Sequence, residues 1–584
     1  MLSDDCIIEC SQRWDVSSNW KAFFNDPAAR CPMDHADSMT WSLAGGATEL
    51  TRIPIRPEAP PKAPVFGLRL ATGLAGVLLA VLLAGFNEHT TEAGLADIRG
   101  AFHLGHDEGT WFTALFEAFN IAAMAFAPWC SVTFSIRRLT IAMTGLVGAL
   151  GMIAPFMPNL TSLLLLRCVQ GMACGCLPPM LMTVALRFLP PNIKIYGLGA
   201  YALTATFGPN LGGAPLAGFW FEYVGWPFLF WQIVPLCLVS MICVAWGLPQ
   251  DPIRLERFRQ FDWRGLLTGL PSICMLVIAL EQGDRLDWFR SPLITHLFFG
   301  GGFLFVLFIV NEWFHPVPFF RIQLLKQRNV TDALLTLAAV LVLGAVTAEI
   351  PAVYLEEVRG YRPIQIAPVM LILAVPQVLA LPLVSALCNI RRVDCRHVLM
   401  TGLAIQGLSY FLGTWIDADW VRENFYAMQF LQVASEPMMV IAILMLATMG
   451  LGPADGPFIS GMFNMTKGVA NAIAAAVISA LLRRREQFHS TMLLDTYGTN
   501  HNGLQPWGDP AHALLAPHIA DPARLDWNMI VLLHGEVSEQ ALILACADIY
   551  TIMIGVCAVL LALNLVLPQR VYPPRALSTT APAR

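Results

Sequence analysis

Ionisable and amide side chains within apolar stretches are the residues of this sequence that could do chemistry. Arg167 and Gln170 lie in LLLLRCVQGMACG (163–175), inside a segment long enough to cross a lipid bilayer. An unpaired charge at that depth is costly, so an arginine there indicates a function by default. Glu117 is equally isolated, because the apolar run AFNIAAMAFA follows it directly.

Three predicted helices bring their charges to one level. Glu117 and Arg167 lie six and seven residues from the outer ends of their spans, which places both about 10 Å below the membrane surface. Glu88 reaches a similar depth in the first span, and Glu92 follows one turn later on the same face. A carboxylate buried beside an arginine can exchange a proton in the range where a transmembrane pH difference matters. The candidates for proton coupling are Glu117, Arg167, Glu88, Glu92 and His89.

A second stretch, TFGPNLGG (206–213), carries small residues along one face of a helix. Thr204, Gly208 and Gly212 recur at every fourth position, which lets another membrane helix approach backbone to backbone. Pro209 cannot donate a hydrogen bond to the preceding turn, so we expect the helix to bend or loosen there.

Each of these residues also has a plainer interpretation. Glu88 and Glu92 could be ordinary solvated residues at the outer mouth of the protein. Glu117 could form a purely structural ion pair, and the glycines could serve helix packing alone.

The composition places the chain in a membrane. It has 584 residues, 56% hydrophobic and 13% charged, with a mean hydropathy of +0.59. The net charge of −5 includes no basic block, so we expect no nucleic-acid partner. No GxxxxGK[ST] phosphate-binding motif occurs, and the histidines and cysteines lack a convincing ligand spacing. We therefore expect no cofactor, no metal and no catalytic residue.

Fourteen apolar segments of about 17 to 28 residues could each cross ~30 Å of hydrocarbon. They begin near Phe66, Trp111, Leu139, Leu160, Ile195, Trp226, Leu266, Leu293, Asp332, Gln365, His397, Phe425, Phe458 and Asp548. Most loop lysines and arginines lie inside if both termini are cytoplasmic, as the positive-inside rule requires. The cluster Arg483–Arg485, directly after the thirteenth span, is an exception to this rule.

The spans predict an all-α integral membrane protein in five parts. A polar, proline-rich cytoplasmic tail (1–65) precedes six spans (66–248), then two extra spans with their connecting loops (249–329), six further spans (330–567) and a cytoplasmic tail (568–584). The longest outer loop is 483–545; we expect it to contain a short amphipathic helix or to be an unstructured connection.

These stretches together resemble a known family. The LxxxRxxQGxxxG and GPxxGG runs are similar to the fourth- and fifth-helix signatures of the major facilitator superfamily, the latter in the form that its exporters carry. Fourteen spans, WPFLFWQIVP (226–235) and YLEEVRGYRPIQIAP (354–368) resemble its drug:proton antiporter branch of the EmrB/QacA type. The resemblance implies two six-helix bundles plus two central extra spans, with the substrate bound between the bundles. It implies a conformational motif formed by Gln170, Gly171, Gly208, Pro209, Gly212 and Gly213.

The sequence departs from the family pattern at two places. The loop between helices two and three usually reads GxLxDRxGRR and forms a cytoplasmic gate; APWCSVTFSIRRL (127–139) keeps only Arg137 and Arg138. The gate must therefore be built differently. In the first helix, Asn87 stands where the branch carries an aspartate, and Glu88 is next to it.

The resemblance and the intramembrane carboxylates predict a proton-coupled transporter of the bacterial inner membrane that exports small amphipathic toxic compounds or drugs by alternating access. The candidates for lining its substrate cavity in the second half are Glu349, Glu436, Asn464 and Lys467. The outer loop implies partners as in the family, a periplasmic membrane-fusion adaptor and an outer-membrane channel. Two alternatives stay open: an uncoupled facilitator or importer of a small organic solute, and a membrane-embedded enzyme or sensor.

Overall fold

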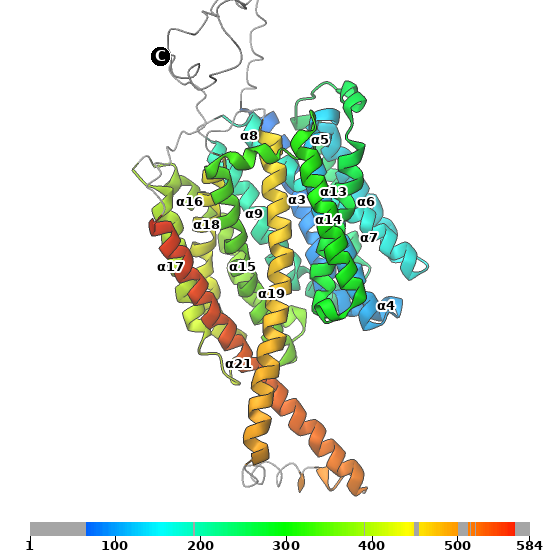
Figure 1. Ribbon diagram of the computed structural model, residues 1–584, viewed down its shortest axis with the longest axis vertical. Coiled ribbons are helices and arrows are strands. Elements are labelled where there is room, and N and C mark those ends of the chain that lie inside the picture. The colour runs from blue at the N-terminus through cyan, green and yellow to red at the C-terminus, as the bar shows by residue number, and fades with distance from the viewer. Residues whose placement is uncertain are drawn as a thin grey trace, which may run out of the picture. The chain divides into compact units, whose positions relative to one another are not determined.

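The computed structural model describes residues 66–566, apart from 191–192, 391, 449–454, 500–511, 514 and 520. The predicted tails at 1–65 and 568–584 lie outside these residues. Every regular element in the described part is a helix, which confirms the all-α prediction (Figure 1). We call the end of the bundle at which α3 (Leu68–Ala93) begins the Leu68 end, and the opposite end the Ala93 end; they are at the top and bottom of Figure 1.

The first half of the described chain contains short and long helices joined by tight turns. After α3 they are α4 (Leu95–Phe102), α5 (His106–Phe134), α6 (Ile136–Ile153), α7 (Leu160–Gly175), α8 (Leu177–Phe188), α9 (Lys194–Gly212), α10 (Ala214–Tyr223), α11 (Phe228–Trp231) and α12 (Ile233–Gly247). The two central helices are α13 (Trp263–Gly283) and α14 (Pro292–Phe314). The second half contains α15 (Arg328–Glu357), α16 (Pro363–Cys388), α17 (Cys395–Gly413), α18 (Tyr426–Thr448), α19 (Gly456–Thr499) and α21 (Pro522–Val566).

Twelve helices of the described residues are long and apolar enough to cross a membrane. Fourteen spans were predicted. The remaining two, near Ile195 and His397, correspond to α9 and α17, which have 19 residues each but are not among those twelve. Both pack between other helices of the bundle, α9 against α3 and α16, and α17 against α18 and α21. The count of fourteen is therefore confirmed for twelve spans only.

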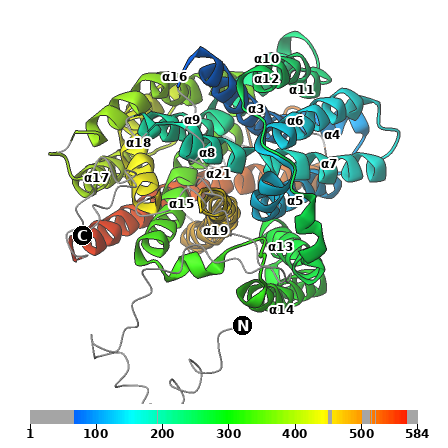
Figure 2. The same ribbon diagram turned by 90° about the horizontal axis from the view of Figure 1, so that it is seen from above.

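The long helices form two groups that meet along their length. In the first group α5 packs on α7, and α3 packs on α9 and α12; in the second, α18 packs on α16 and α17, and α19 on α15 and α21. The groups touch where α9 meets α16 and where α19 meets α5 and α8, as the view from above shows (Figure 2). Helix α13 lies beside α5 and α19, and α14 packs on the outer side of α13. Helix α14 exposes large apolar side chains such as Phe299, Phe303 and Val306.

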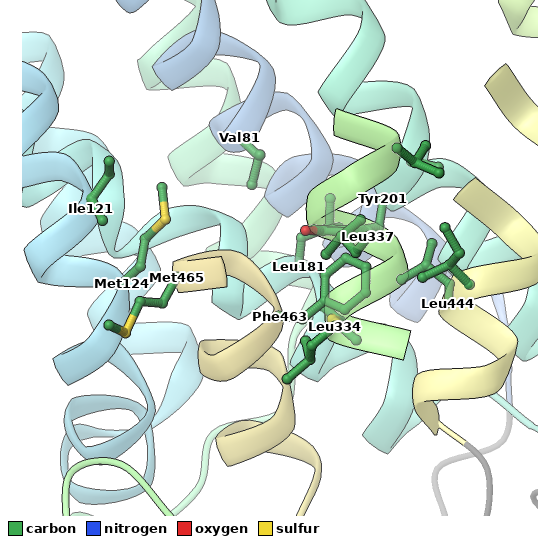
Figure 3. Packing of buried hydrophobic residues seen from close by; sticks show 14 of the residues in the cluster. Val81, Ile121, Met124, Leu181, Tyr201, Leu334, Leu337, Leu444, Phe463 and Met465 are labelled. Carbon is green, nitrogen blue, oxygen red and sulfur yellow. The ribbon is translucent and has the colours of Figure 1, made fainter. Parts of the chain in front are cut away.

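An apolar layer joins the two groups towards the Leu68 end. Leu181 and Tyr201 from the first group lie against Leu334, Leu337 and Phe463 from the second (Figure 3). The Tyr201 hydroxyl also donates a 2.8 Å hydrogen bond to Asn464. All five of these apolar side chains are buried, so the two groups are packed together at the Leu68 end.

The linkers on either side of α13 and α14 cover the Leu68 end of α5. Phe261 before α13 and Phe319 after α14 both make edge contacts with the buried Trp129. Arg321 in the second linker forms a 2.9 Å ion pair with Asp455, the residue before α19. These linkers thus bring an aromatic cluster and an ion pair to the face where the family gate motif is missing.

The segment predicted as the outer loop 483–545 is helical over most of its described length. Helix α19 has 44 residues and α21 has 45, so each is about 65 Å long, roughly twice the thickness of the hydrocarbon layer. The sequence contains no glycine or proline between Gly468 and Gly498, so nothing ends α19 at the predicted membrane surface. Helices α19 and α21 pack on each other, and we call this pair the α19–α21 hairpin. The two helices are joined where Asp548 on α21 accepts hydrogen bonds from Arg485 and His489 on α19.

We predict that the crossing of α3 and α12 tolerates only glycine at Gly247. A Cβ atom there would lie 2.2 Å from the backbone nitrogen of Gly73. Gly247→Val should therefore separate the helices, destabilise the fold by roughly 1–3 kcal/mol, and lower Tm and the yield of monodisperse protein. Gly302→Val on α14 is the matched control, because its Cβ would have no neighbour within 4 Å. Equal Tm values for the two variants would contradict the prediction.

Candidate functional site

The last turns of α3 present different side chains to three neighbouring helices. Asn87 and Thr91 face α7, where they meet Gln170 and Arg167. Thr90 faces α9 and donates a 2.7 Å hydrogen bond to the carbonyl oxygen of Gly212. Glu88 is directed towards α5 instead, where it meets Asn120. Because successive residues of a helix point about 100° apart, one short segment serves all three contacts.

Arg167 is buried, with 1% of its surface exposed, and its partners are neutral. The guanidinium donates to the Gln170 side chain at 3.0 Å and to the Thr91 hydroxyl at 2.9 Å. The ring centroids of Phe112 and Phe116 lie 4.5 and 4.0 Å from its central carbon, which adds cation–π contacts. Arg167 thus joins α3, α5 and α7.

Arg167 and Glu117, both candidates for proton coupling, form no direct ion pair in the structure. No carboxylate of the described residues lies within 4.0 Å of the Arg167 guanidinium. The reason is the order of residues on α5: Phe116 faces α7 and covers the guanidinium, and Glu117 points one residue further round the helix. The two charges act on each other only at longer range.

Glu117 is paired with Glu88 instead. The Asn120 amide donates to Glu117 Oε2 at 3.1 Å and to Glu88 Oε2 at 3.2 Å. Two carboxylates that accept from one amide repel each other, so a proton on one of them would stabilise the pair. Sequence reasoning missed Asn120, which is a single amide within an apolar run.

His89 and Glu92 lie nearer the Ala93 end, and of the two only Glu92 is strongly exposed. His89 Nδ1 is 3.1 Å from Glu92 Oε2, and its Nε2 is 3.9 Å from Glu88 Oε1. The Glu92 side chain is 65% exposed, against 25% for Glu88. The histidine therefore links the exposed carboxylate to the half-buried pair.

The second half contributes a carboxylate and a lysine at the same level. Glu436 lies in the middle of α18, where it accepts from the Thr206 hydroxyl on α9 at 2.7 Å and from Gln377 on α16 at 3.1 Å. The charge of Lys467 on α19 acts on Glu436 and on both Glu88 and Glu117. We call Glu88, Glu117, Glu436 and Lys467 the polar layer. Thr206 and Gln377 were not among the predicted residues, although Gln377 is a lone polar residue in an apolar span.

The other two candidates of the second half lie on either side of the polar layer. Asn464 is buried in the apolar layer, where it bonds Tyr201. Glu349 on α15 lies towards the Ala93 end, within electrostatic range of Glu92 and of Glu281 on α13. Glu281 was not among the predicted residues. The sequence feature that could have identified it is a carboxylate near the end of one of the two extra spans. Within the described ranges, no three histidine, cysteine or acidic side chains are grouped as a metal site requires.

The predicted glycines lie at close helix contacts. A Cβ on Gly171 would lie 2.3 Å from the carbonyl oxygen of Phe116, and one on Gly212 would lie 2.8 Å from the Phe86 ring. Gly208 is less tight, with the His89 ring 3.3 Å from its Cβ position. Helix α9 continues through Pro209 and breaks at Gly213, whose N–H bonds the Pro209 carbonyl at 3.0 Å. The break thus occurs one turn later than Pro209 suggested.

Comparisons with known proteins agree with this architecture. The family model described as Major Facilitator Superfamily matches residues 77–349. The fatty acid resistance protein FarB of Neisseria gonorrhoeae is 25% identical over 496 residues, 82% of this chain and 92% of FarB. The multidrug export protein EmrB of Escherichia coli (strain K12) is 22% identical over 507 residues, 86% of this chain and 96% of EmrB. The crystal structure of the human organic anion transporter MFSD10 (TETRAN) has a similar fold, with a TM-score of 0.51 at 11% identity, over 84% of this chain and 100% of that chain.

We predict that Gln170 is needed to keep Arg167 buried. Gln170→Leu removes one acceptor from the guanidinium and the 3.1 Å bond from Gln170 to Asn87. Loss of a hydrogen bond to a buried charge should destabilise the fold by roughly 1.5–3 kcal/mol, measured as a lower Tm in detergent. Gln170→Glu is the matched control: it keeps an acceptor for Arg167, and the unpartnered Asn87 amide nitrogen can turn towards it. A Tm loss of equal size in both variants would contradict this role.

Proposed function

We propose that this chain, which matches the Major Facilitator Superfamily model over residues 77–349, is a member of that family and exports small amphipathic toxic compounds in exchange for protons, by alternating access. The relatives named for fatty acid resistance and multidrug export match it over most of their length, which supports an exported substrate of this class. The observation that carries the proton exchange is the Glu88–Glu117 carboxyl pair on Asn120, opposite Lys467.

The exchange that we propose uses the charge of the polar layer. With one proton, the Glu88–Glu117 pair carries a single negative charge and Lys467 a positive one. When the proton leaves, the pair gains a second negative charge, which attracts Lys467 on α19 or a cationic group of the substrate more strongly. Since α3 and α5 belong to one group of helices and α19 to the other, protonation changes the attraction between the groups.

We propose that the Leu68 end faces the cytoplasm of a bacterium and that the protein lies in its inner membrane. Exposed arginines gather at that end, including Arg254, Arg259 and Arg264. The apolar layer near the Leu68 end closes the cytoplasmic path, so the polar layer would be reached from the outside. Opening of the cytoplasmic side would then require the Arg321–Asp455 ion pair and the apolar layer to separate.

We predict that Glu117→Gln abolishes uphill export and retains substrate binding. The glutamine fixes a neutral group at the pair, so that no proton is released there. In proteoliposomes with an imposed pH gradient, uphill export should be lost and substrate-induced proton release should vanish. Glu88→Gln should behave similarly, and the exposed Glu357→Gln on α15 should match the wild type.

The outcome of this assay also separates the alternatives. Export at the wild-type rate with intact proton coupling in Glu117→Gln would place the carrier elsewhere. Downhill flux that ignores the pH gradient in the wild type would instead indicate an uncoupled facilitator, and gradient-driven uptake an importer. No transport at all, with chemical turnover of the added compound, would indicate an enzyme.

We further propose that the α19–α21 hairpin meets an adaptor protein with a single membrane anchor, which leads to an outer-membrane channel. The hairpin exposes large apolar side chains on both helices, among them Phe488, Met492, Trp527 and Ile530. Such residues outside the membrane are typical of a protein–protein contact surface. These residues lie on a hairpin whose two helices are each longer than the membrane is thick, and this supports a partner in the periplasm.

We predict opposite accessibility for the two ends of the protein. A cysteine at the exposed Gly535 on α21 should react with an impermeant thiol reagent in cells whose outer membrane alone is permeabilised. A cysteine at the exposed Arg259 should react only after the inner membrane is disrupted. The parent protein corrects for labelling of its native cysteines. Reversed labelling would place the hairpin in the cytoplasm, and the adaptor proposal would fall with it.

A further inference from the structure

The three arginines that contradict the positive-inside rule have different surroundings. Arg483 forms ion pairs with Asp284 at 3.0 Å and with Asp287 at 2.7 Å. Arg485 pairs with Asp548. Arg484, between them, is exposed and forms no ion pair with the residues that the structure describes. Two of the three charges are thus neutralised, and Arg484 keeps its charge at the point where the apolar part of α19 ends.

An apolar groove of about 360 Å³ runs from this arginine along α13 and α19. Its walls are Leu280 on α13, Trp288 and Phe289 in the turn before α14, and Ile473 and Val477 on α19; Arg484 stands at its rim. Phe289, Ile473 and Val477 are each at least 38% exposed. In a membrane-spanning protein such side chains contact lipid, so the groove is open to the bilayer.

The wall of the groove that is formed by the turn before α14 has a strained backbone. Asp287 and Trp288 are consecutive non-glycine residues with left-handed backbone angles, φ 58° and 51°. Such strain persists only where the surroundings impose it. Here Arg483 holds Asp287, and the Trp288 ring packs 2.8 Å from the Cβ position of Gly283. The turn of the two extra spans is thereby fastened to α19, and the groove between them is a built feature.

From these observations we propose that the groove binds an anionic phospholipid of the leaflet at the Ala93 end. One acyl chain lies along Leu280, Ile473 and Val477, and the phosphate is bound by the Arg484 guanidinium, whose planar fork matches phosphate oxygens. The lipid fills the groove between α13 and α19. Its net negative headgroup complements the one arginine of the cluster that the protein leaves without an acidic partner. This inference does not depend on the substrate or the direction of transport.

The test is a titration of the purified full-length protein in detergent with phosphatidylglycerol and phosphatidylcholine of identical acyl chains, followed by native mass spectrometry. The wild type should retain phosphatidylglycerol preferentially. Arg484→Gln should reduce that preference roughly fivefold, the factor expected for one arginine near an anionic surface. Arg524→Gln is the matched control, because Arg524 is exposed on α21 and does not line the groove.

A second variant separates the groove from general surface charge. Ala480→Phe fills the groove without a change in charge, so it should reduce retention of both lipids. Wild-type protein without a preference for phosphatidylglycerol, or Arg484→Gln with an unchanged preference, would overturn the proposal. Loss of preference in Arg484→Gln together with normal retention in Ala480→Phe would also overturn it, because charge alone would then explain the binding.

Discussion

The burial of Arg167 is the constraint on which the amino-terminal half depends. A charged side chain at the centre of a membrane helix costs roughly 3 kcal/mol, and here no carboxylate offsets that cost directly. The guanidinium is stabilised by Thr91, Gln170 and two phenyl rings instead. These partners belong to α3, α5 and α7, so the charge can be buried only when the three helices are correctly packed.

Neutral partners for the arginine leave the nearby carboxyl groups free for each other. If Arg167 formed a direct ion pair with Glu117, a proton would have to displace a buried counter-charge. In the observed arrangement Glu117 shares Asn120 with Glu88, and the nearest cation of the polar layer, Lys467, belongs to the other group of helices. In the exchange that we propose, the protonation state of the pair changes the attraction between the two groups, where alternating access requires a change.

The two extra spans, α13 and α14, and their linkers make contacts at both ends of the bundle. Their linkers bring Phe261, Phe319 and the Arg321–Asp455 pair to the Leu68 end, where the family loop motif has lost its aspartate. At the other end α13 brings Glu281 towards Glu349, and the α13–α14 turn is held by Arg483. A pair of helices at the edge of the bundle thus contributes residues at both the Leu68 end and the Ala93 end.

The sequence by itself determined the helical class, the approximate positions of the spans and the residues worth testing. Apolar length decides whether a helix can cross a bilayer, and a charge such as Glu117 within such a segment is visible without coordinates. Only the tertiary structure decided which charges meet. A shift of one residue turns a side chain by about 100°, so Phe116 rather than Glu117 covers Arg167, and the carboxylate pairs with Glu88 through an asparagine that no spacing rule identifies. The ion pair between Arg483 on α19 and Asp287 in the α13–α14 turn likewise joins residues 196 positions apart in the chain, and nothing local in the sequence encodes it.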